Sequence, residues 1–216
     1  MGVASTPALS PDRFVRSVEA SRDTLGKPRM KLIEVVHEVT RLTAGAPYAV
    51  IGGLAQILWA RKSHTDDLDV ALEADALHGA LDRVRDGGAS ASWSLPSPPD
   101  RPDESDDVIE VVHLLHDGAV VDLLTFREAS LTLEIVSTAQ TVAELGNIRF
   151  IRPELLLVTH LLRPGPLGAL AAVELVIARR TAGGIDMDET RSWATRLGRE
   201  TRLDQIIAQA AAFQMI

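Results

Sequence analysis

Apolar positions in the first third of the chain follow helical and strand spacings in alternation. Residues 29–40 place apolar side chains on one wide face of a predicted helix. Residues 48–51 form a short apolar run typical of a buried strand, and two glycines separate it from a predicted helix over 54–59. We expect a second strand at 68–72 and a further helix at 74–84. This order of elements indicates a sheet flanked by helices.

The middle of the chain alternates between apolar and polar residues. Residues 108–115 and 119–126 flank a short turn that ends in Gly118, and this pattern predicts a β-hairpin. A short strand is expected at 91–93. Residues 95–107 contain four prolines and five acidic residues, which predicts an exposed, mobile loop before the hairpin.

After residue 126 the pattern becomes mainly helical, with a short extended piece at 148–151. The predicted helices cover residues 153–162, 167–180, 187–197 and 203–213. Together the elements predict an α+β fold, with a small mixed β-sheet core flanked by helices over residues 13–126 and a mostly helical region over 127–216. Residues 1–12, rich in Ser, Pro and Ala, are expected to form a flexible tail.

Composition narrows the classes of function. The 216 residues are 46% apolar and 24% charged, which is ordinary for a folded protein, and the net charge of −8 argues against a broad basic surface for duplex DNA. The chain has no cysteine, which excludes thiolate zinc sites, disulfide scaffolds and cysteine nucleophiles. Residues 1–12 do not resemble a signal peptide, and the most apolar tract, 155–178, is interrupted by charged residues and prolines. We therefore expect a cytoplasmic protein with no membrane partner.

Candidate chemistry begins with two acidic residues. Asp67 and Asp69 are two positions apart on a predicted strand, so their side chains share one face, while Leu68 and Val70 point to the opposite face, into the core. Adjacent carboxylates repel each other unless a cation lies between them, and Mg²⁺ prefers oxygen ligands. The spacing therefore predicts a divalent cation site.

Two further features surround this pair. Gly52 and Gly53 lie where a predicted strand turns into a helix, and backbone N–H groups at such a helix start can hold a phosphate. Asp122 occupies a similar place on the second hairpin strand. Three carboxylates on adjacent strands beside a phosphate cradle suit two-metal phosphoryl or nucleotidyl transfer.

The composite motif resembles a known superfamily. It consists of Gly-Gly, thirteen residues, Asp-Leu-Asp and a later strand Asp, and it resembles the nucleotidyltransferases of the DNA polymerase β type. The spacing from Gly53 to Asp67, together with Arg61 and Thr65, is most similar to the bacterial minimal and AbiEii-like branch, which includes toxins of type IV toxin–antitoxin systems. The resemblance covers about residues 47–126.

The resemblance implies a role for each matching residue. Asp67, Asp69 and Asp122 would hold Mg²⁺ (or Mn²⁺), and Asp122 would also help to deprotonate an acceptor hydroxyl. Gly52 and Gly53 would hold the β and γ phosphates of an NTP substrate. The remaining nucleotide-binding candidates are Arg61, Lys62, Ser63, Thr65 and His160.

The sequence also departs from the AbiEii-like pattern. Where a lysine is expected after the Pro-Glu-x-Leu stretch, this chain has His160, which is either a phosphate contact or a core histidine. The downstream Lys-Asp-x-x-Asp pattern is missing, and only Glu174 offers an acid there. Elsewhere, His113 and His116 are spaced to lie on opposite strand faces, so they are not expected to share a metal. The alternative to an active enzyme is a weakened nucleotidyltransferase-like protein that binds nucleotide or a partner without turnover.

The acceptor stays open between a tRNA 3′ end or other RNA, a partner protein and a small molecule such as an aminoglycoside. A type IV toxin would also have a cognate antitoxin as partner. Late arginines form either solvated helix faces or a patch for RNA. They are Arg179, Arg180, Arg191, Arg196, Arg199 and Arg202.

Overall fold

The computed structural model describes residues 32–60, 65–96 and 108–213, and it shows the predicted α+β fold. Its centre is a seven-stranded mixed sheet. In spatial order the strands are β3 (Trp93–Ser94), β4 (Val108–His116), β5 (Ala119–Phe126), β2 (Asp67–Leu72), β1 (Tyr48–Val50), β7 (Ile148–Phe150) and β6 (Gln140–Val142).

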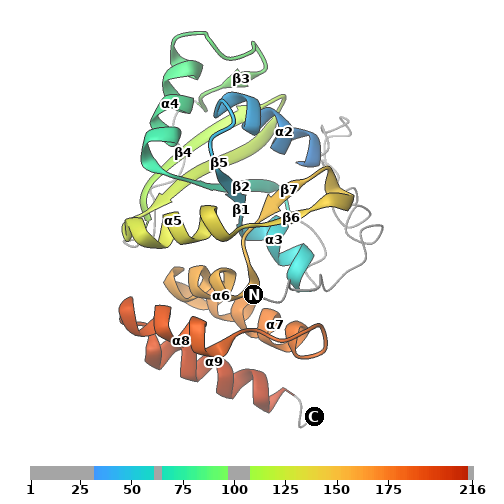
Figure 1. The fold of residues 1–216 in the computed structure, drawn as a ribbon, viewed down its shortest axis with the longest axis vertical. Helices are drawn as coiled ribbons and strands as arrows, with labels where there is room; N and C mark the ends of the chain where they lie inside the picture. The colour runs from blue at the N-terminus through green and yellow to red at the C-terminus, as the bar shows by residue number, and fades with distance from the viewer. Residues whose placement is uncertain (1–31, 61–64, 97–107, 214–216) are drawn as a thin grey trace.

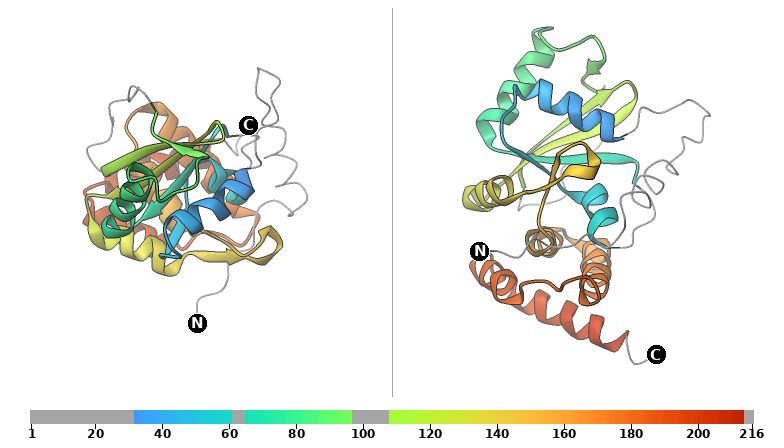
Figure 2. Two further views of the ribbon diagram at one scale, coloured as in Figure 1. Left: turned by 90° about the horizontal axis from the view of Figure 1, so that it is seen from above. Right: turned by 45° about the vertical axis from the view of Figure 1, so that its right-hand side comes forward.

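Helices pack around the sheet, and several of them form a helical region beyond one end of it. In the described part of the chain they are α2 (Leu32–Leu42), α3 (Gly52–Trp59), α4 (Ala74–Arg85), α5 (Ala129–Thr138), α6 (Pro153–Leu162), α7 (Gly165–Arg180), α8 (Met187–Arg196) and α9 (Glu200–Ala212), with a short 3-10 helix at Ala143–Leu145. Figure 1 shows α6 to α9 gathered below the sheet, with α2 and α4 toward the opposite end. Helix α3 contacts β2 on one side and both α6 and α7 on the other. The turned view of Figure 2 shows α3 between the sheet and the C-terminal helices.

Strand pairing brings distant segments together. The predicted hairpin is confirmed: β4 and β5 pair antiparallel from His116 opposite Ala119 outward. Strand β5 also pairs with β2 in parallel, and β1 pairs antiparallel with β2 and parallel with β7. Strand β2 therefore lies between one neighbour from earlier in the chain and one from more than 45 residues later.

The structure adjusts several predicted boundaries. Helix α3 begins at Gly52 and so includes both glycines, and α7 and α9 each begin two or three residues before the predicted start. Strand β6 was not expected, because its three residues are too few for a strand periodicity and only Val142 is buried. The predicted extended piece at 148–151 is confirmed as β7. The predicted tail, and most of the predicted loop at 95–107, lie outside the described residues.

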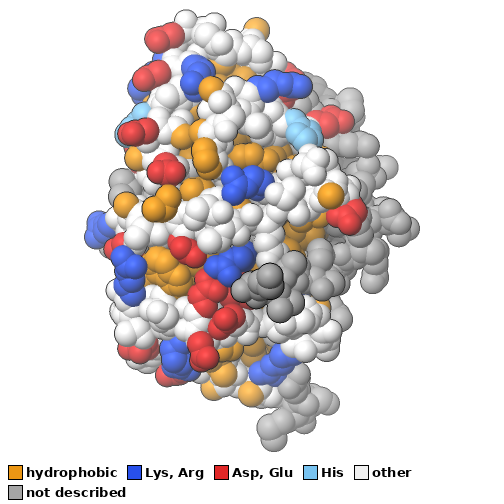
Figure 3. All heavy atoms as spheres, viewed as in Figure 1, with side chains coloured by type: hydrophobic (Ala, Val, Ile, Leu, Met, Phe, Trp, Pro, Cys, Tyr) orange, Lys and Arg blue, Asp and Glu red, His pale blue; other side chains and the backbone are white. Residues whose placement is uncertain are grey.

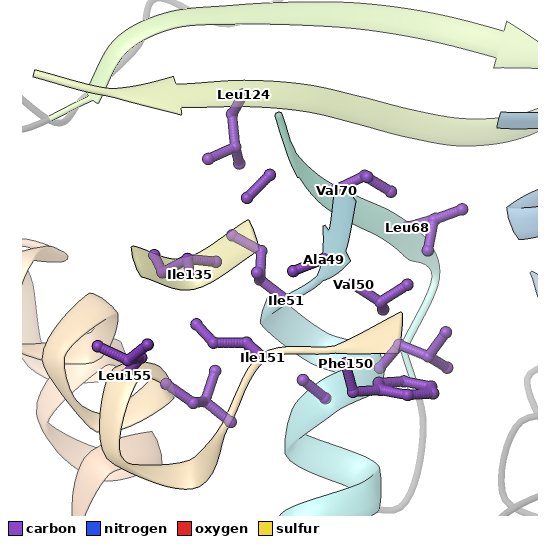
Figure 4. Close-up of a cluster of buried hydrophobic side chains, with 14 of the residues drawn as sticks. Ala49, Val50, Ile51, Leu68, Val70, Leu124, Ile135, Phe150, Ile151 and Leu155 are labelled. Atoms are coloured by element: carbon purple, nitrogen blue, oxygen red, sulfur yellow. The ribbon is translucent and has the colours of Figure 1, made fainter. Parts of the chain in front are cut away.

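The core between sheet and helices fixes the register of β2. Figure 4 shows side chains from β1, β2, β5, β7, α5 and α6 pointing toward one another. Leu68 and Val70 have no exposed surface, nor do Val50, Phe150 and Leu155. Burying one such side chain stabilises the fold by about 1.5–3 kcal/mol, and a slip of one residue would turn every β2 side chain to the wrong face. The apolar residues of β2 thereby determine where its acidic residues point.

The surface carries charges of both signs. On the face shown in Figure 3, basic and acidic side chains are interspersed and neither sign dominates. None of the described helices is long and apolar enough to cross a membrane.

Candidate metal centre

The two acidic residues of β2 share one face of the strand, as predicted. Asp67 and Asp69 are partly exposed, whereas Leu68 and Val70 between and beyond them are fully buried. This alternation follows from the pleat, because successive side chains of a strand point to opposite sides.

Asp122 joins this pair through the parallel pairing of β2 with β5. Asp69 lies directly opposite Asp122 in the register, so the two side chains lie side by side on the same face. One carboxylate oxygen from each of Asp67, Asp69 and Asp122 lies within 4.8 Å of the other two. The structure thus brings together the three carboxylates that the sequence singles out.

The cluster is electrostatically unfavourable by itself. Burial raises the pKa of Asp69 to about 7, and the negative charges of Asp67 and Asp122 contribute to the increase. The backbone N–H of Gly53 and the positive charge of Arg163 lower the pKa of Asp69, but they do not cancel these effects. Since ionising a third carboxylate here is costly, a cation would stabilise the cluster.

Asp67 is oriented by its near neighbour in sequence. The Thr65 hydroxyl donates to Asp67 Oδ1 over 2.7 Å, and the Thr65 side chain is buried. The structure therefore places Thr65 against a carboxylate of the cluster. This contact fixes how β2 begins, because Asp67 is the first residue of the strand.

Asp69 is held by the start of α3. The Gly53 N–H donates to Asp69 Oδ2 over 3.3 Å. Gly52 has a φ of +56°, and a Cβ there would lie 1.8 Å from Asp69 Oδ2. The residue before the helix, Ile51, makes no side-chain hydrogen bond to the first N–H groups of α3. The Asp69 carboxylate accepts from one of these groups and so partly replaces an N-cap side chain. Glycine is therefore needed at position 52 for the strand and the helix to approach this closely.

Asp122 is held by a histidine that the sequence analysis did not connect with the site. His113 Nδ1 lies 2.8 Å from Asp122 Oδ1. The two residues are directly opposite each other in the hairpin. The signal was present in the sequence: a turn that pairs His116 with Ala119 necessarily pairs His113 with Asp122.

The donor set fits a hard divalent cation. All three groups offer carboxylate oxygen, which is the ligand that Mg²⁺ prefers. Oxygens bound to one Mg²⁺ at about 2.1 Å lie about 3.0 Å apart when adjacent and about 4.2 Å apart when opposite. Since the observed oxygens already lie within 4.8 Å, small side-chain rotations would suffice to bind Mg²⁺ or Mn²⁺.

The other predicted nucleotide contacts have different positions. Arg61, Lys62 and Ser63 lie outside the described residues. His160 is buried, with Nε2 2.9 Å from Oε1 of Gln56 on α3. Gln56 in turn donates to the carbonyl of Ala171 on α7 over 2.8 Å. A phosphate contact through Nε2 of His160 would therefore require breaking a buried hydrogen bond between helices.

Arg163 is an exposed cation near the cluster that the sequence analysis did not single out. Trp59, at the end of α3, donates to the carbonyl of Ile151 just before α6, whereas Gln56 contacts His160 near the end of α6. The two helices therefore run in opposite directions, and the end of α6 with Arg163 lies toward the glycines that begin α3. Its charge acts on Asp69, as the lowering effect on that pKa shows.

The late arginines make contacts within the protein. Arg179 is fully buried, with its guanidinium 5.7 Å from the ring centroid of Trp59. Other contacts join Arg180 to the carbonyl of Ala210, Arg191 to Asp204, Arg196 to Glu128, and Arg202 to the carbonyls of Arg163 and Gly165. An RNA-binding role for this set stays a prediction.

Comparison with protein-family models and with curated proteins finds no match for this chain.

Proposed function

We propose that the protein is a Mg²⁺-dependent (or Mn²⁺-dependent) nucleotidyltransferase that moves a nucleoside monophosphate from an NTP to an acceptor hydroxyl. The observation that carries this proposal is the convergence of Asp67, Asp69 and Asp122 on one face of two parallel strands, with their oxygens within 4.8 Å. The glycine pair that begins α3 lies directly against this cluster. Carboxylates that lie this close to the N-terminal end of a helix suit a cation and a phosphate together, because the acids can bind the cation and the helix N–H groups can bind the phosphate.

Each residue has a definite task in this proposal. The three aspartates would hold the metal, which supplies positive charge to the phosphate oxygens when bound. The N-terminal end of α3 at Gly52 and the side chain of Arg163 would orient the β and γ phosphates. The acceptor oxygen attacks the α-phosphorus, the bond to the β-phosphate breaks, and pyrophosphate leaves. Asp122 accepts the hydroxyl proton.

A second candidate is supported by the buried state of His160. Its ring contacts Gln56 at the position where AbiEii-like enzymes would carry a phosphate-binding lysine. We therefore keep as the alternative a weakened nucleotidyltransferase-like protein that binds nucleotide or a partner without turnover. Transfer in a labelled assay separates the two, because only the first candidate predicts a labelled product.

The acceptor and partners belong to the proposal as well. An RNA such as a tRNA 3′ end, a partner protein or a small molecule such as an aminoglycoside could each offer the hydroxyl. If the acceptor is tRNA, the protein fits the toxin of a type IV toxin–antitoxin pair, and an antitoxin is then its expected partner.

The test uses the full chain with Mg²⁺ and each α-labelled NTP in turn. Total RNA, the protein itself and an aminoglycoside serve as acceptors. Asp67→Ala should abolish transfer, whereas Asp66→Ala should not, because Asp66 is the exposed neighbour outside the cluster. Equal transfer by wild type and Asp67→Ala would overturn the metal assignment. Mg²⁺-dependent NTP binding without transfer to any acceptor would favour the alternative.

A further inference from the structure

The three carboxylates of the cluster share one arrangement that the proposed reaction does not explain. Within the described part of the chain, each accepts a hydrogen bond from a donor in a different segment. Thr65 Oγ1 donates to Asp67 over 2.7 Å and the Gly53 N–H donates to Asp69 over 3.3 Å. His113 contacts Asp122 over 2.8 Å. Like charges this close turn away from each other unless they are held, so the donors prepare the set for a cation.

We propose that His113 is a positioning residue of this site, which holds the Asp122 carboxylate toward the other two acids so that its second oxygen remains available to the cation. The inference deepens the proposed function and rests on it. It assigns a role to a residue on β4, a strand that contributes none of the three acids.

The geometry of the hairpin supports this role. His113 and Asp122 are directly opposite each other on β4 and β5, and β4 is held on its other side by β3. Their side chains are 29% and 20% exposed, so both are partly shielded from water. A carboxylate only accepts hydrogen bonds, so Nδ1 of His113 carries the hydrogen that it donates to Oδ1. The contact engages Oδ1, and in this proposal the other oxygen, Oδ2, bonds the cation.

A second histidine–carboxylate pair provides a matched comparison. His78 Nε2 lies 2.6 Å from Glu110 Oε2, and these side chains are 53% and 35% exposed. Glu110 also lies on β4, but it is not part of the acidic cluster. Because Glu110 lies outside the cluster, its contact with His78 should have no influence on cation binding.

The experiment measures Mn²⁺ affinity of the full chain by calorimetry and by the electron paramagnetic resonance signal of free Mn²⁺. His113→Phe keeps a ring but removes the donor, and we expect Mn²⁺ affinity to fall about 10- to 100-fold. His113→Asn places an amide N–H close to where Nδ1 lies, and we expect affinity within about 3-fold of wild type. His78→Phe should leave the affinity unchanged.

Thermal unfolding of the metal-free variants shows whether a variant loses Mn²⁺ affinity because the Asp122 carboxylate is no longer held or because the fold is destabilised. If His113→Phe binds Mn²⁺ as tightly as wild type, or if His113→Asn is weakened as much as His113→Phe, the inference is overturned. If His113→Phe does not fold, His113→Leu replaces it under the same criteria. Failure of the wild type itself to bind Mn²⁺ would overturn the proposed metal site, whereas wild-type binding with unaffected variants overturns only the role of His113.

Discussion

The Oδ2 atom of Asp69 occupies the space that a side chain at Gly52 would need. A Cβ at Gly52 would lie 1.8 Å from this oxygen and 2.5 Å from the Asp69 Cγ, and the backbone there has a φ of +56°. The strand that carries the acids and the helix that follows β1 can therefore meet only if this residue is glycine. The candidate site and the packing of α3 on β2 depend on the same contact.

Gly52→Ala should displace the Asp69 carboxylate. We expect a loss of stability on the order of 3 kcal/mol, from the clash together with the strained backbone, and at least about 10-fold weaker Mn²⁺ binding. Gly45→Ala is the matched control, because Gly45 has a φ of +76° but no atom within 4 Å of a Cβ. It should cost only about 1 kcal/mol and leave Mn²⁺ binding intact. Urea unfolding and calorimetry would measure both, and equal effects from the two variants would contradict the prediction.

The raised pKa of Asp69 predicts how stability changes with pH in the metal-free protein. In the folded state this pKa is about 7, against an ordinary value of 3.8, so the folded chain binds more protons than the unfolded chain between these values. The stabilising contribution is fully present below about pH 3.8 and is lost as the pH rises through about 7. Allowing for partial exposure, we expect the loss to be on the order of 2 kcal/mol between pH 5 and pH 8.

Asp69→Asn isolates this effect, because the amide does not titrate. With a metal chelator present, urea unfolding at pH 5 and pH 8 should show a smaller decrease for Asp69→Asn than for wild type. Asp66→Asn should follow wild type, since Asp66 lies outside the cluster. Mg²⁺ added at pH 8 should restore stability to wild type more than to Asp69→Asn. Parallel pH profiles for wild type and Asp69→Asn would show that Asp69 ionises without penalty.

Much of the site could be predicted because it depends on local periodicity. The alternation of Leu68 and Val70 with the two acids of β2 fixes which face the carboxylates take, and only the core face tolerates the apolar residues. The β4–β5 hairpin was predictable for the same reason. The approach of Asp122 to Asp69 needed one more step, namely that β5 pairs in parallel with β2, which no local pattern encodes.

The contacts that complete the site arise from tertiary structure. The neighbours of His113 in the sequence indicate only that it lies in a strand. Its contact with Asp122 follows from the pairing register of β4 and β5. The end of α6 with Arg163 lies toward the site because α6 runs antiparallel to α3, a packing that depends on buried side chains of both helices. Gly52 was expected to serve a phosphate, whereas its conformation is already required by the Asp69 carboxylate.

His160→Lys distinguishes a core histidine from a phosphate contact. The His160 side chain is 6% exposed and bonded to Gln56, so a lysine there would bury an ammonium group among apolar neighbours. We expect a loss of stability on the order of 3 kcal/mol and no gain in nucleotide affinity. Leu170→Lys, at a position on α7 that is 52% exposed, should be nearly neutral in stability. A stable His160→Lys variant that binds nucleotide more tightly would place this side chain in the nucleotide site instead.

Arg163→Gln should weaken the binding of an anion without weakening the binding of the cation. Arg163 is exposed at the end of α6, and its charge opposes that of Asp69. Removing it should leave Mn²⁺ binding unchanged or strengthen it by about 2- to 5-fold, because the acids lose a nearby positive charge. Binding of tripolyphosphate in the presence of Mn²⁺ should weaken by about 10-fold or more, since a charge-assisted hydrogen bond to phosphate is lost.

Arg191→Gln, which removes an exposed arginine paired with Asp204, controls for net charge and should affect neither affinity. A parallel fall in both affinities would indicate that Arg163 supports the fold, and no change in either would remove it from the site.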